Sequence, residues 1–481
     1  MYENMKNYSM RYKLIFTAIF GIILGLLLLV GNRTSWGAII SVSLFFTYLA
    51  LRIKMGAEVV YKYFIYIIII SIPFPLCLFQ FAGKDALNAT TVAIYLLFAA
   101  MMLDALFERK TINVKPKYTL VLPFLIIISL TLSLICNSLF IGQSFKFYIA
   151  NVSGVLLYFI IITTLKKPSE TVMLIKIILI LLIVQSVIAF LEWKYPIVAK
   201  YLIPFGREIV DPKAYVIEGV LRVKGTILDY ELLAEWFLLG SFLSMGLVYY
   251  LKNNFYFFPL LCCIMGIIFT ATRSVIFLLV AGLVGVFMLL ATFKKEYKLT
   301  SLKIIFLLIL SSLLLLVIFP QQVDKFANRF VMYFQHGSLL SPEAINRKVT
   351  WKMAIDTFKS GPAVFGNGLY RIEALYFWAG SFHSLYMTLL YKIGIFGLIV
   401  YVVFWAKMLL HSWHVLNINK DRENWYIVLF LFISVILMLM NEIKIEYMRY
   451  EHTIQFAWLI YALLVSSLKQ DRKINENIMV S

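Results

Sequence analysis

The sequence predicts an all-α polytopic membrane protein with about 14 (12–14) transmembrane helices and a large helical external loop. Hydrophobic residues make up 62% and charged residues 14% of the 481 positions, whereas soluble domains carry about 45–50% apolar and about 25% charged residues. Apolar runs of roughly 20 residues, long enough to cross a bilayer as helices, recur through the chain. The predicted spans are 14–30, 36–52, 60–80, 88–107, 118–137, 147–165, 171–193, 230–251, 255–271, 274–293, 301–320, 382–410, 424–441 and 452–468.

Basic residues in alternate short connections predict the orientation. With a cytoplasmic N-terminus, the even-numbered connections are rich in lysine and arginine, for example at 109–117, 166–167 and 294–298, as the positive-inside rule requires. Both termini, including the tail 469–481, are then expected in the cytoplasm. This rule accounts for the basic excess, a formal net charge of +19, without a nucleic-acid partner. Leu14–Val30 is interpreted as a retained span, because no small-residue cleavage site follows it.

The chain is expected to form a single membrane domain over 1–481, without internal repeats or low-complexity segments. Most external connections are short. Residues 194–229 are expected to form an external loop, and 321–381 a large external (periplasmic or extracellular) catalytic loop. A further external connection, 441–451, is dense in charge.

The large loop contains the signals of one amphipathic helix. Ser341 and Pro342 predict its start, as a hydroxyl N-cap followed by a proline in the first helical position. Gly361 and Pro362 predict its end. The apolar residues between them indicate a helix on or just above the membrane surface. Two interpretations remain open, a cap without chemistry and a part of the catalytic site.

Arginines on the external side are candidates for function, because the positive-inside rule would remove them from that side. Four stand out: Arg207, Arg222, Arg273 and Arg347. Arg273 lies between two apolar runs, and a charge near the membrane centre costs roughly 2.5–3.5 kcal/mol. It requires an internal carboxylate or an anionic ligand, unless its side chain extends to the interface. Planar guanidinium groups bind phosphate oxygens bidentately, so Arg222, Arg273 and Arg347 together suit a pyrophosphate.

Histidine and carboxylate side chains on the same side are candidates for proton transfer. His383 opens a span directly after the large loop, and a neutral imidazole can accept a proton from an attacking hydroxyl. Glu231 and Glu235 are four residues apart and share one helix face, and with Asp229 they are alternatives to His383. His452, at the start of the last span, is a weaker candidate.

Lys392 lies nine residues after His383, roughly 13 Å further along a helix. Either it pairs with an internal acid such as Glu192, or it lies near the surface because its span begins above the bilayer.

Several motifs are missing from the sequence. It has no D-x-D, H-E-x-x-H, C-x-x-C, Walker or G-x-G-x-x-G motif, and its four cysteines lie in apolar runs. No metal, cofactor or ATP hydrolysis is therefore expected. Energy for a reaction must come from an activated substrate or a gradient.

Three segments resemble the bacterial O-antigen ligase and O-antigen polymerase family, which includes capsule and teichuronic acid polymerases. The first is Arg222-Val-Lys-Gly225-Thr, and the second is Thr270-Ala-Thr-Arg273-Ser. The third comprises Arg347-Lys-Val-Thr-Trp351, Gly366-Asn-Gly368, His383-Ser384-Leu-Tyr386 and Gly394-Ile-Phe-Gly397. The sequence departs from the family pattern in three places. Ile227-Leu-Asp-Tyr230 stands where Asn-Pro-Asn is common, Ser384 where the family often has asparagine, and Lys392 where an acid is common.

The resemblance implies a metal-independent glycosyltransferase with a GT-C-like membrane fold, in the bacterial inner (cytoplasmic) membrane. Its donor would be an oligosaccharide on undecaprenyl pyrophosphate at the outer leaflet. The catalytic residues would be Arg222, Arg273 and Arg347, which would bind the pyrophosphate, and His383, which would position or deprotonate the acceptor hydroxyl. Arg207, Glu231, Glu235 and Trp351 are expected to contact substrate.

Three functions are compatible with these features. The first is a polysaccharide polymerase that extends another lipid-linked repeat. The second is a ligase that transfers the glycan to a lipid A core or a wall acceptor. The third is a lipid-linked glycan flippase or transporter, for which charged residues should line a path through the membrane. The candidate charges instead gather at one face. The expected partners are the lipid-linked oligosaccharide, membrane lipid, a flippase and a chain-length regulator, with no nucleic acid.

Overall fold

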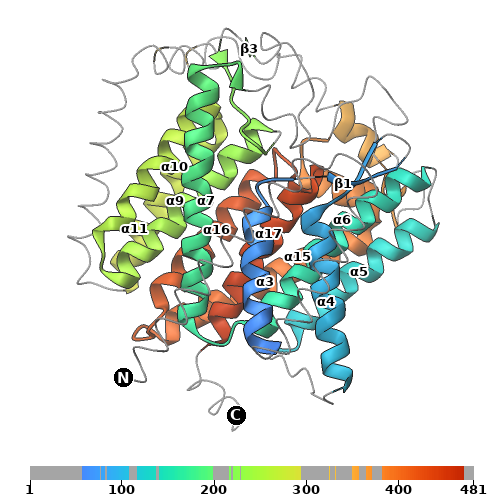
Figure 1. The fold of residues 1–481 in the computed structure, drawn as a ribbon, viewed down its shortest axis with the longest axis horizontal. Coiled ribbons are helices and arrows are strands. Elements are labelled where there is room, and N and C mark those ends of the chain that lie inside the picture. The colour runs from blue at the N-terminus through green and yellow to red at the C-terminus, as the bar shows by residue number, and fades with distance from the viewer. Residues whose placement is uncertain are drawn as a thin grey trace.

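The computed structural model describes residues 57–75, 77–81, 84–107, 116–136, 140–198, 216–217, 220–227, 229–293, 349–356, 364–370 and 382–470, with the single positions 324 and 331. The predicted spans 14–30, 36–52 and 301–320 lie outside these residues. Within them the chain forms a helical bundle (Figure 1). Its long helices are α3 (Ala57–Ser71), α4 (Ala89–Phe107), α5 (Tyr118–Cys136), α6 (Ile141–Thr164), α7 (Pro168–Lys194), α9 (Tyr230–Leu251), α10 (Phe257–Thr270), α11 (Arg273–Phe293), α15 (Leu385–Ile418), α16 (Trp425–Asn441) and α17 (Glu451–Lys469).

Seven of these helices are long and apolar enough to cross a membrane, namely α4, α5, α6, α7, α9, α11 and α15. The protein is therefore a polytopic membrane protein. Helices α10 and α16 are apolar but shorter. Eleven of the predicted spans coincide with a helix in the described residues, which confirms the helical fold class at this level.

One predicted span is wrong in its second half. The prediction placed a single helix over 60–80, but α3 ends at Ser71 and the chain continues into a strand, β1 (Cys77–Phe81). Pro73 and Pro75 explain the difference, because proline lacks an amide hydrogen and its ring clashes with the preceding helical turn. The fold also departs from purely α in two short antiparallel hairpins. These pair β1 with β2 (Lys84–Asn88) and β3 (Val216–Ile217) with β4 (Val220–Leu221).

Helix α9 is buried from Glu231 to Tyr249. It packs against α10 and α16, while α17 packs on α6 and α15 on α5. Close approach of these helices depends on small residues, as is common in membranes. Gly154 of α6 faces the Trp458 ring of α17, and a Cβ at Gly154 would meet that ring at 2.5 Å.

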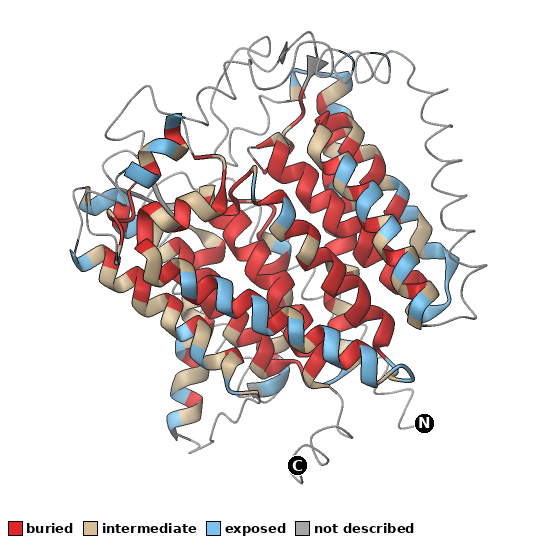
Figure 2. Ribbon diagram, turned by 180° about the vertical axis from the view of Figure 1, so that it is seen from behind, coloured by how far each residue is buried: buried red, intermediate tan, exposed pale blue. Residues whose placement is uncertain are grey.

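The outward sides of the peripheral helices are apolar. On α11, Phe277, Val280, Val284 and Met288 are all more than half exposed and follow the helical spacing of a single face. Figure 2 shows the same contrast, with buried segments in the centre and exposed ones on the peripheral helices. In a membrane protein such a stripe contacts lipid, so the exposed apolar residues fit a bilayer environment.

Contacts between helix ends define two faces of the bundle. At one end, Arg449 contacts Asp229 before α9, Lys444 contacts Ser274 at the start of α11, and the Leu385 amide of α15 donates to Glu442. The starts of α9, α11, α15 and α17 and the segment 441–449 thus share one face, hereafter the site face. The opposite face holds the ion pair of Lys62 with Glu170 and the contact of Tyr250 with Glu423. This arrangement agrees with the alternation of spans predicted from the sequence.

Helix α15 is broken close to the site face. Gly394 has φ 69° and ψ −170°, a conformation that only glycine adopts readily. The turn 364–370 of the large loop fills the break. The Asn367 amide donates to the Tyr391 carbonyl at 2.8 Å, and the Phe396 amide to the Val364 carbonyl at 3.2 Å. These bonds satisfy backbone groups that the break would otherwise leave without helical partners.

The break also places Lys392. Residues 395–418 alone exceed the roughly 20 residues that cross a bilayer, so the shorter part of α15, with Lys392, lies toward the site face. The Lys392 carbonyl accepts a hydrogen bond from Ser133 near the end of α5, and its ammonium lies 3.6 Å from the Phe147 ring centre. The Lys392 side chain is buried, and the two arrangements left open by the sequence stay predictions.

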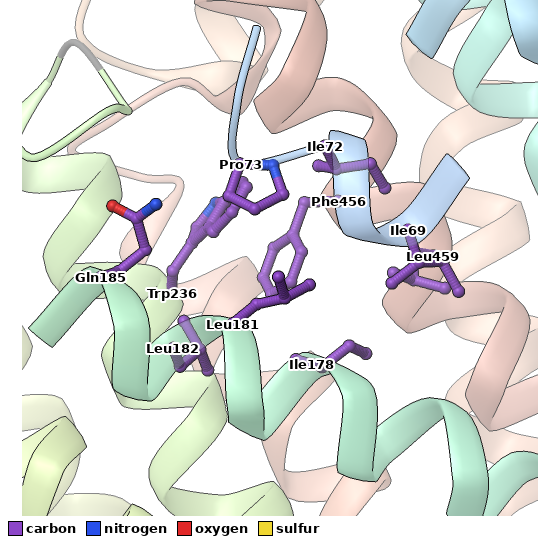
Figure 3. A pocket seen from close by; sticks show the side chains of 10 residues that line it. All are labelled: Ile69, Ile72, Pro73, Ile178, Leu181, Leu182, Gln185, Trp236, Phe456 and Leu459. Atoms are coloured by element: carbon purple, nitrogen blue, oxygen red, sulfur yellow. The ribbon is translucent and has the colours of Figure 1, made fainter. Parts of the chain in front are cut away.

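A small apolar cavity lies among α3, α7, α9 and α17 (Figure 3). Ile72, Trp236 and Phe456 contribute to its walls, and Gln185 is the amide side chain at its edge. Gln185 donates to the Thr226 hydroxyl at 2.6 Å, so the cavity lies next to the turn that follows Arg222. No charged side chain lines it, which separates it from the polar cluster described next.

Candidate functional site

Arg222 is a buried cation on the site face. Its exposed fraction is 8%, and its guanidinium lies 4.6 Å from the centre of the Tyr230 ring. Its Nε has no hydrogen-bond partner among the described residues. Burying a charge without full pairing is costly, and guanidinium groups bind oxyanions strongly. The Arg222 side chain is therefore suited to bind an anionic group.

The turn that carries Arg222 is held against α7. The Glu192 carboxylate accepts hydrogen bonds from the amides of Gly225 at 2.9 Å and Lys224 at 3.2 Å. Gly225 has φ 56°, which explains why glycine stands at this point of the turn. Two interactions of Gln185 with Thr226 complete the attachment. The acid Glu192 thus supports the backbone after Arg222.

Arg273 begins α11, directly after the short link from α10. Ala271 ends α10 in the left-handed conformation, with φ 51°, so the chain reverses within two residues. The Arg273 side chain is half-buried. Phe269, just before the link, packs with Val223 in one apolar cluster. Val223 directly follows Arg222, and Phe269 lies four residues before Arg273, so this shared cluster brings the two arginine-bearing segments together.

His383 precedes α15 in an unusual backbone conformation. Its φ is 48°, which is uncommon for residues other than glycine and is often associated with functional sites. Trp351, in the helical stretch 349–356, donates its indole N–H to the Phe382 carbonyl at 2.8 Å. Ala354, Tyr370, Phe382 and Tyr391 form a small apolar cluster beneath it. This part of the large loop therefore packs directly on the backbone next to His383.

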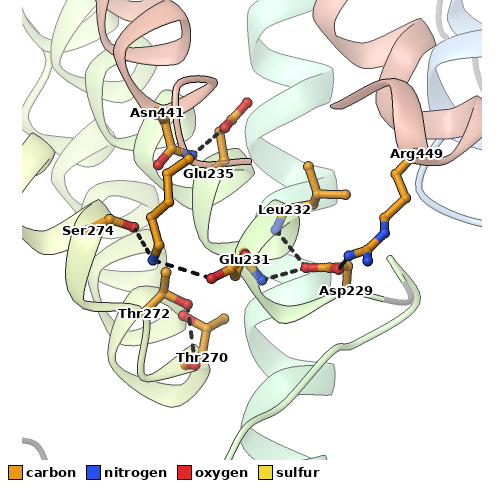
Figure 4. A network of polar contacts seen from close by, with 10 residues as sticks. Asp229, Glu231, Leu232, Glu235, Thr270, Thr272, Ser274, Asn441 and Arg449 are labelled. Carbon is orange, nitrogen blue, oxygen red and sulfur yellow. Dashed lines mark hydrogen bonds and ion pairs between the residues drawn. The ribbon is translucent and has the colours of Figure 1, made fainter. Parts of the chain in front are cut away.

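Three carboxylates at the start of α9 have partners from other elements (Figure 4). Asp229 caps α9 by accepting from the Glu231 amide at 2.8 Å, and it pairs with Arg449 at 2.8 Å. Glu231 pairs with Lys444 at 3.3 Å. Glu235 is buried and accepts a hydrogen bond from Asn441. These contacts give each carboxylate a structural partner, and the roles in substrate contact expected for Glu231 and Glu235 stay predictions.

The segment 441–449 supplies the residues that sequence reasoning did not assign. Its charge density was visible in the sequence, but its contacts with the starts of α9, α11 and α15 were not. Burial raises the pKa of the Glu442 carboxyl, and the neighbouring Glu235 and Glu446 carboxylates raise it further. Burial lowers the pKa of Arg449, but the Asp229 carboxylate outweighs this effect, so the pKa of the guanidinium is raised. Arg449 accordingly stays cationic.

The remaining candidates divide into two groups. Arg207 and Arg347 lie outside the described residues, so their predicted roles stay predictions. His452 is buried, and its Nε2 lies 3.0 Å from the Ile227 carbonyl oxygen, which gives it a contact with the turn after Arg222. No group of three or more histidine, cysteine, aspartate or glutamate side chains forms a metal site within the described ranges.

The fold and site define a polytopic membrane protein with buried arginine, histidine and carboxylate side chains gathered at one face. Residues 258–402 match the O-antigen ligase family (Wzy_C). Over this segment, the resemblance seen in the sequence to the family of O-antigen ligases and polymerases is confirmed. The match includes the Arg273 link, the large loop, His383 and the break in α15. No curated protein sequence matches the chain.

Proposed function

We propose that this protein is a polysaccharide polymerase. It transfers a glycan from undecaprenyl pyrophosphate to the end of another lipid-linked repeat. The observation that carries the proposal is the buried Arg222 guanidinium, whose Nε lacks a partner among the described residues, close to the Arg273 link and on the face that carries His383. An anionic diphosphate would complete the hydrogen bonding of such a group.

The reaction needs two kinds of assistance. The acceptor hydroxyl oxygen forms a bond to the anomeric carbon of the donor sugar, and the bond from that carbon to the phosphate oxygen breaks. Undecaprenyl pyrophosphate leaves with the bonding electron pair. Arg222 and Arg273, joined by Arg347 from the large loop, stabilise the charge that develops on the leaving pyrophosphate. The proton of the acceptor hydroxyl passes to the neutral imidazole of His383.

This assignment places the site face on the outer side of the inner membrane, with both termini in the cytoplasm. The helical stretch 349–356 contacts the backbone next to His383, which supports a role for the loop 321–381 at the site. A flippase would supply the donor at this leaflet, and a chain-length regulator would limit the product. A lipid diphosphate is a good leaving group, so neither a nucleotide nor a metal is required.

A ligase is the second candidate, because the family matched by residues 258–402 is described as O-antigen ligase. The two functions share donor and site and differ only in the acceptor. A ligase would move the glycan to a lipid A core or a wall acceptor, whereas a polymerase extends a second lipid-linked repeat.

The test uses the purified full-length protein in lipid nanodiscs with lipid-linked repeats and no ATP. We expect longer glycans and free undecaprenyl pyrophosphate, and a loss of at least about 100-fold in rate for Arg222→Ala, Arg273→Ala and His383→Ala. His414→Ala serves as the matched control, because His414 is exposed at the end of α15 on the opposite face. Wild-type rates in the three site variants would contradict the site. Transfer only to an added lipid A core or wall acceptor would support the ligase, and movement of the donor between leaflets without transfer would support a transporter.

A further inference from the structure

The segment 441–449 contacts the starts of α9, α11 and α15, near the proposed catalytic residues. It reaches the start of α9 through Arg449 and Asp229, at 2.8 Å. It reaches the start of α15 through the Leu385 amide, which donates to the carbonyls of Glu442 at 2.9 Å and Ile445 at 3.2 Å. These elements are far apart in sequence, so their relative position depends on such contacts.

Lys444 is the residue of this segment that bridges two of the elements, α9 and α11. Its ammonium lies 3.3 Å from the Glu231 carboxylate on α9 and 3.4 Å from the Ser274 hydroxyl on α11. Ser274 directly follows Arg273, and Glu231 directly follows Tyr230, whose ring lies under the Arg222 guanidinium. One side chain thus links the neighbours of both arginines.

The surroundings of Lys444 favour a fixed link over a solvated surface contact. The Glu231 side chain is only 10% exposed and that of Lys444 is 36% exposed. An ion pair protected from water on one side is screened less than a pair in open solvent. The Arg449–Asp229 pair, 10% exposed on the acid side, fixes the same turn of α9 from its other side. The Lys444 ammonium therefore acts on a part of α9 that cannot rotate away.

We infer that Lys444 is a positioning residue, which sets the distance between Arg222 and Arg273 by holding the start of α11 against the start of α9. The inference rests on the proposed function, since the spacing matters only if both arginines bind one diphosphate. Misplacement of a reacting group by about 1 Å can cost about 100-fold in rate. Because the arginines act on charge that develops in the transition state, kcat should fall more than KM rises.

The kinetic test compares variants of Lys444 and Glu231 in the nanodisc assay. We expect Lys444→Ala to lower kcat about 10- to 100-fold with a KM for the donor within about three-fold of wild type. Lys444→Arg should recover most of the rate, and the charge exchange Lys444→Glu with Glu231→Lys should recover part of it. Lys444→Ala combined with Glu231→Gln should cost no more than either change alone, because both remove the same link. Lys252→Ala, an exposed lysine on the opposite face, is the matched control.

A second measurement tests the position without any turnover. Spin labels at Lys224 and Phe277, with the native cysteines replaced, report the distance between the Arg222 turn and the start of α11. We expect a narrow distribution in the otherwise unchanged protein and in Lys444→Arg, and a broader or shifted one in Lys444→Ala. An unchanged distance distribution in Lys444→Ala would overturn the inference. If the wild type elongates glycans, an unchanged kcat in Lys444→Ala would overturn it as well. If the wild type elongates no glycan but the distance distribution still changes in Lys444→Ala, the proposed function is wrong. The structural link made by Lys444 is then still supported.

Discussion

The ion pairs on the two faces of the bundle differ widely in their exposure to solvent. On the site face, the ion pairs Arg449–Asp229 and Lys444–Glu231 join elements that are distant in sequence, and their acids are about 10% exposed. On the opposite face, Lys166 and Glu58 lie 2.6 Å apart, but their side chains are 61% and 65% exposed. The Lys62–Glu170 pair on that face is less exposed, at 29% and 13%, so the contrast holds for individual pairs.

Shielded ion pairs can fix the geometry of a site, whereas exposed charges in short connections are expected from membrane orientation alone. Exposed ion pairs contribute roughly 0–1 kcal/mol, because water screens them and two long side chains must be ordered. A lysine in a short connection is expected from orientation alone. The buried acids and arginines on the site face have no such explanation. The comparison predicts that equivalent changes at the two faces will have very different effects.

The largest effect is expected where the large loop meets the break in α15. A Cβ at Gly394 would overlap the Val364 carbonyl and the Gly366 amide, both of which are backbone atoms. The φ of 69° is also unfavourable for alanine. Gly394→Ala should therefore destabilise the protein by about 4 kcal/mol or more, measured by thermal unfolding in detergent. Gly285→Ala on α11 is the control, because a Cβ there meets nothing within 4 Å, and equal stability of the two variants would contradict the docked turn.

A smaller effect is expected from the ion pairs. Arg449→Ala leaves the Asp229 carboxylate buried and unpaired, which costs about 3–5 kcal/mol for fully buried pairs. Because the Arg449 side chain is 26% exposed, we expect roughly 2 kcal/mol. The matched change on the opposite face, Lys166→Ala, should cost less than about 0.5 kcal/mol. Thermal unfolding of both variants checks the contrast, and similar losses would show that the two faces are not different in this respect.

The smallest effect depends on pH. The pKa of Glu442 is raised above its ordinary value of 4.5, first by burial and then by the Glu235 carboxylate. The neutral Glu442 carboxyl therefore makes its full contribution to the free energy of unfolding below pH 4.5. This contribution is lost as the pH rises through the raised pKa. Glu442→Gln keeps an oxygen that can accept from the Tyr447 amide, at 3.0 Å in the wild type, but cannot ionise. The melting temperature of this variant relative to wild type should rise with pH, and a pH-independent difference would contradict the assignment.

Local signals explain why most of the fold could be predicted. The span predicted at 230–251 corresponds to α9 (Tyr230–Leu251), because Asp229 is a strong helix cap and the run after it is apolar. The prediction for the second half of the span 60–80 was wrong, because two prolines interrupt the apolar run there. The break at Gly394 was missed, since a single glycine is tolerated within helices and the turn that fills the break comes from a distant part of the chain.

The site could be predicted only in part. Counting alternating spans was enough to place Arg222, Arg273 and His383 on one side, because each residue lies at the end of a span. The partners of those elements could not be found this way. Arg449 and Asp229 are 220 residues apart, and many acids in the sequence could have paired with Arg449 or Lys444. Which pairs form depends on how α9 and α16 pack, and that is decided by the shapes of apolar side chains.

The docked turn at Gly394 has a consequence for the covalent continuity of the chain. The turn 364–370 is bonded to α15 through the Asn367 amide and the Val364 carbonyl, and the start of α15 is itself bonded to Glu442 and Ile445 through the Leu385 amide. Packing, rather than the connecting peptide, then holds the turn and the start of α15 in place. The protein should therefore tolerate a split within 371–381, with two separately expressed fragments assembling into one functional enzyme.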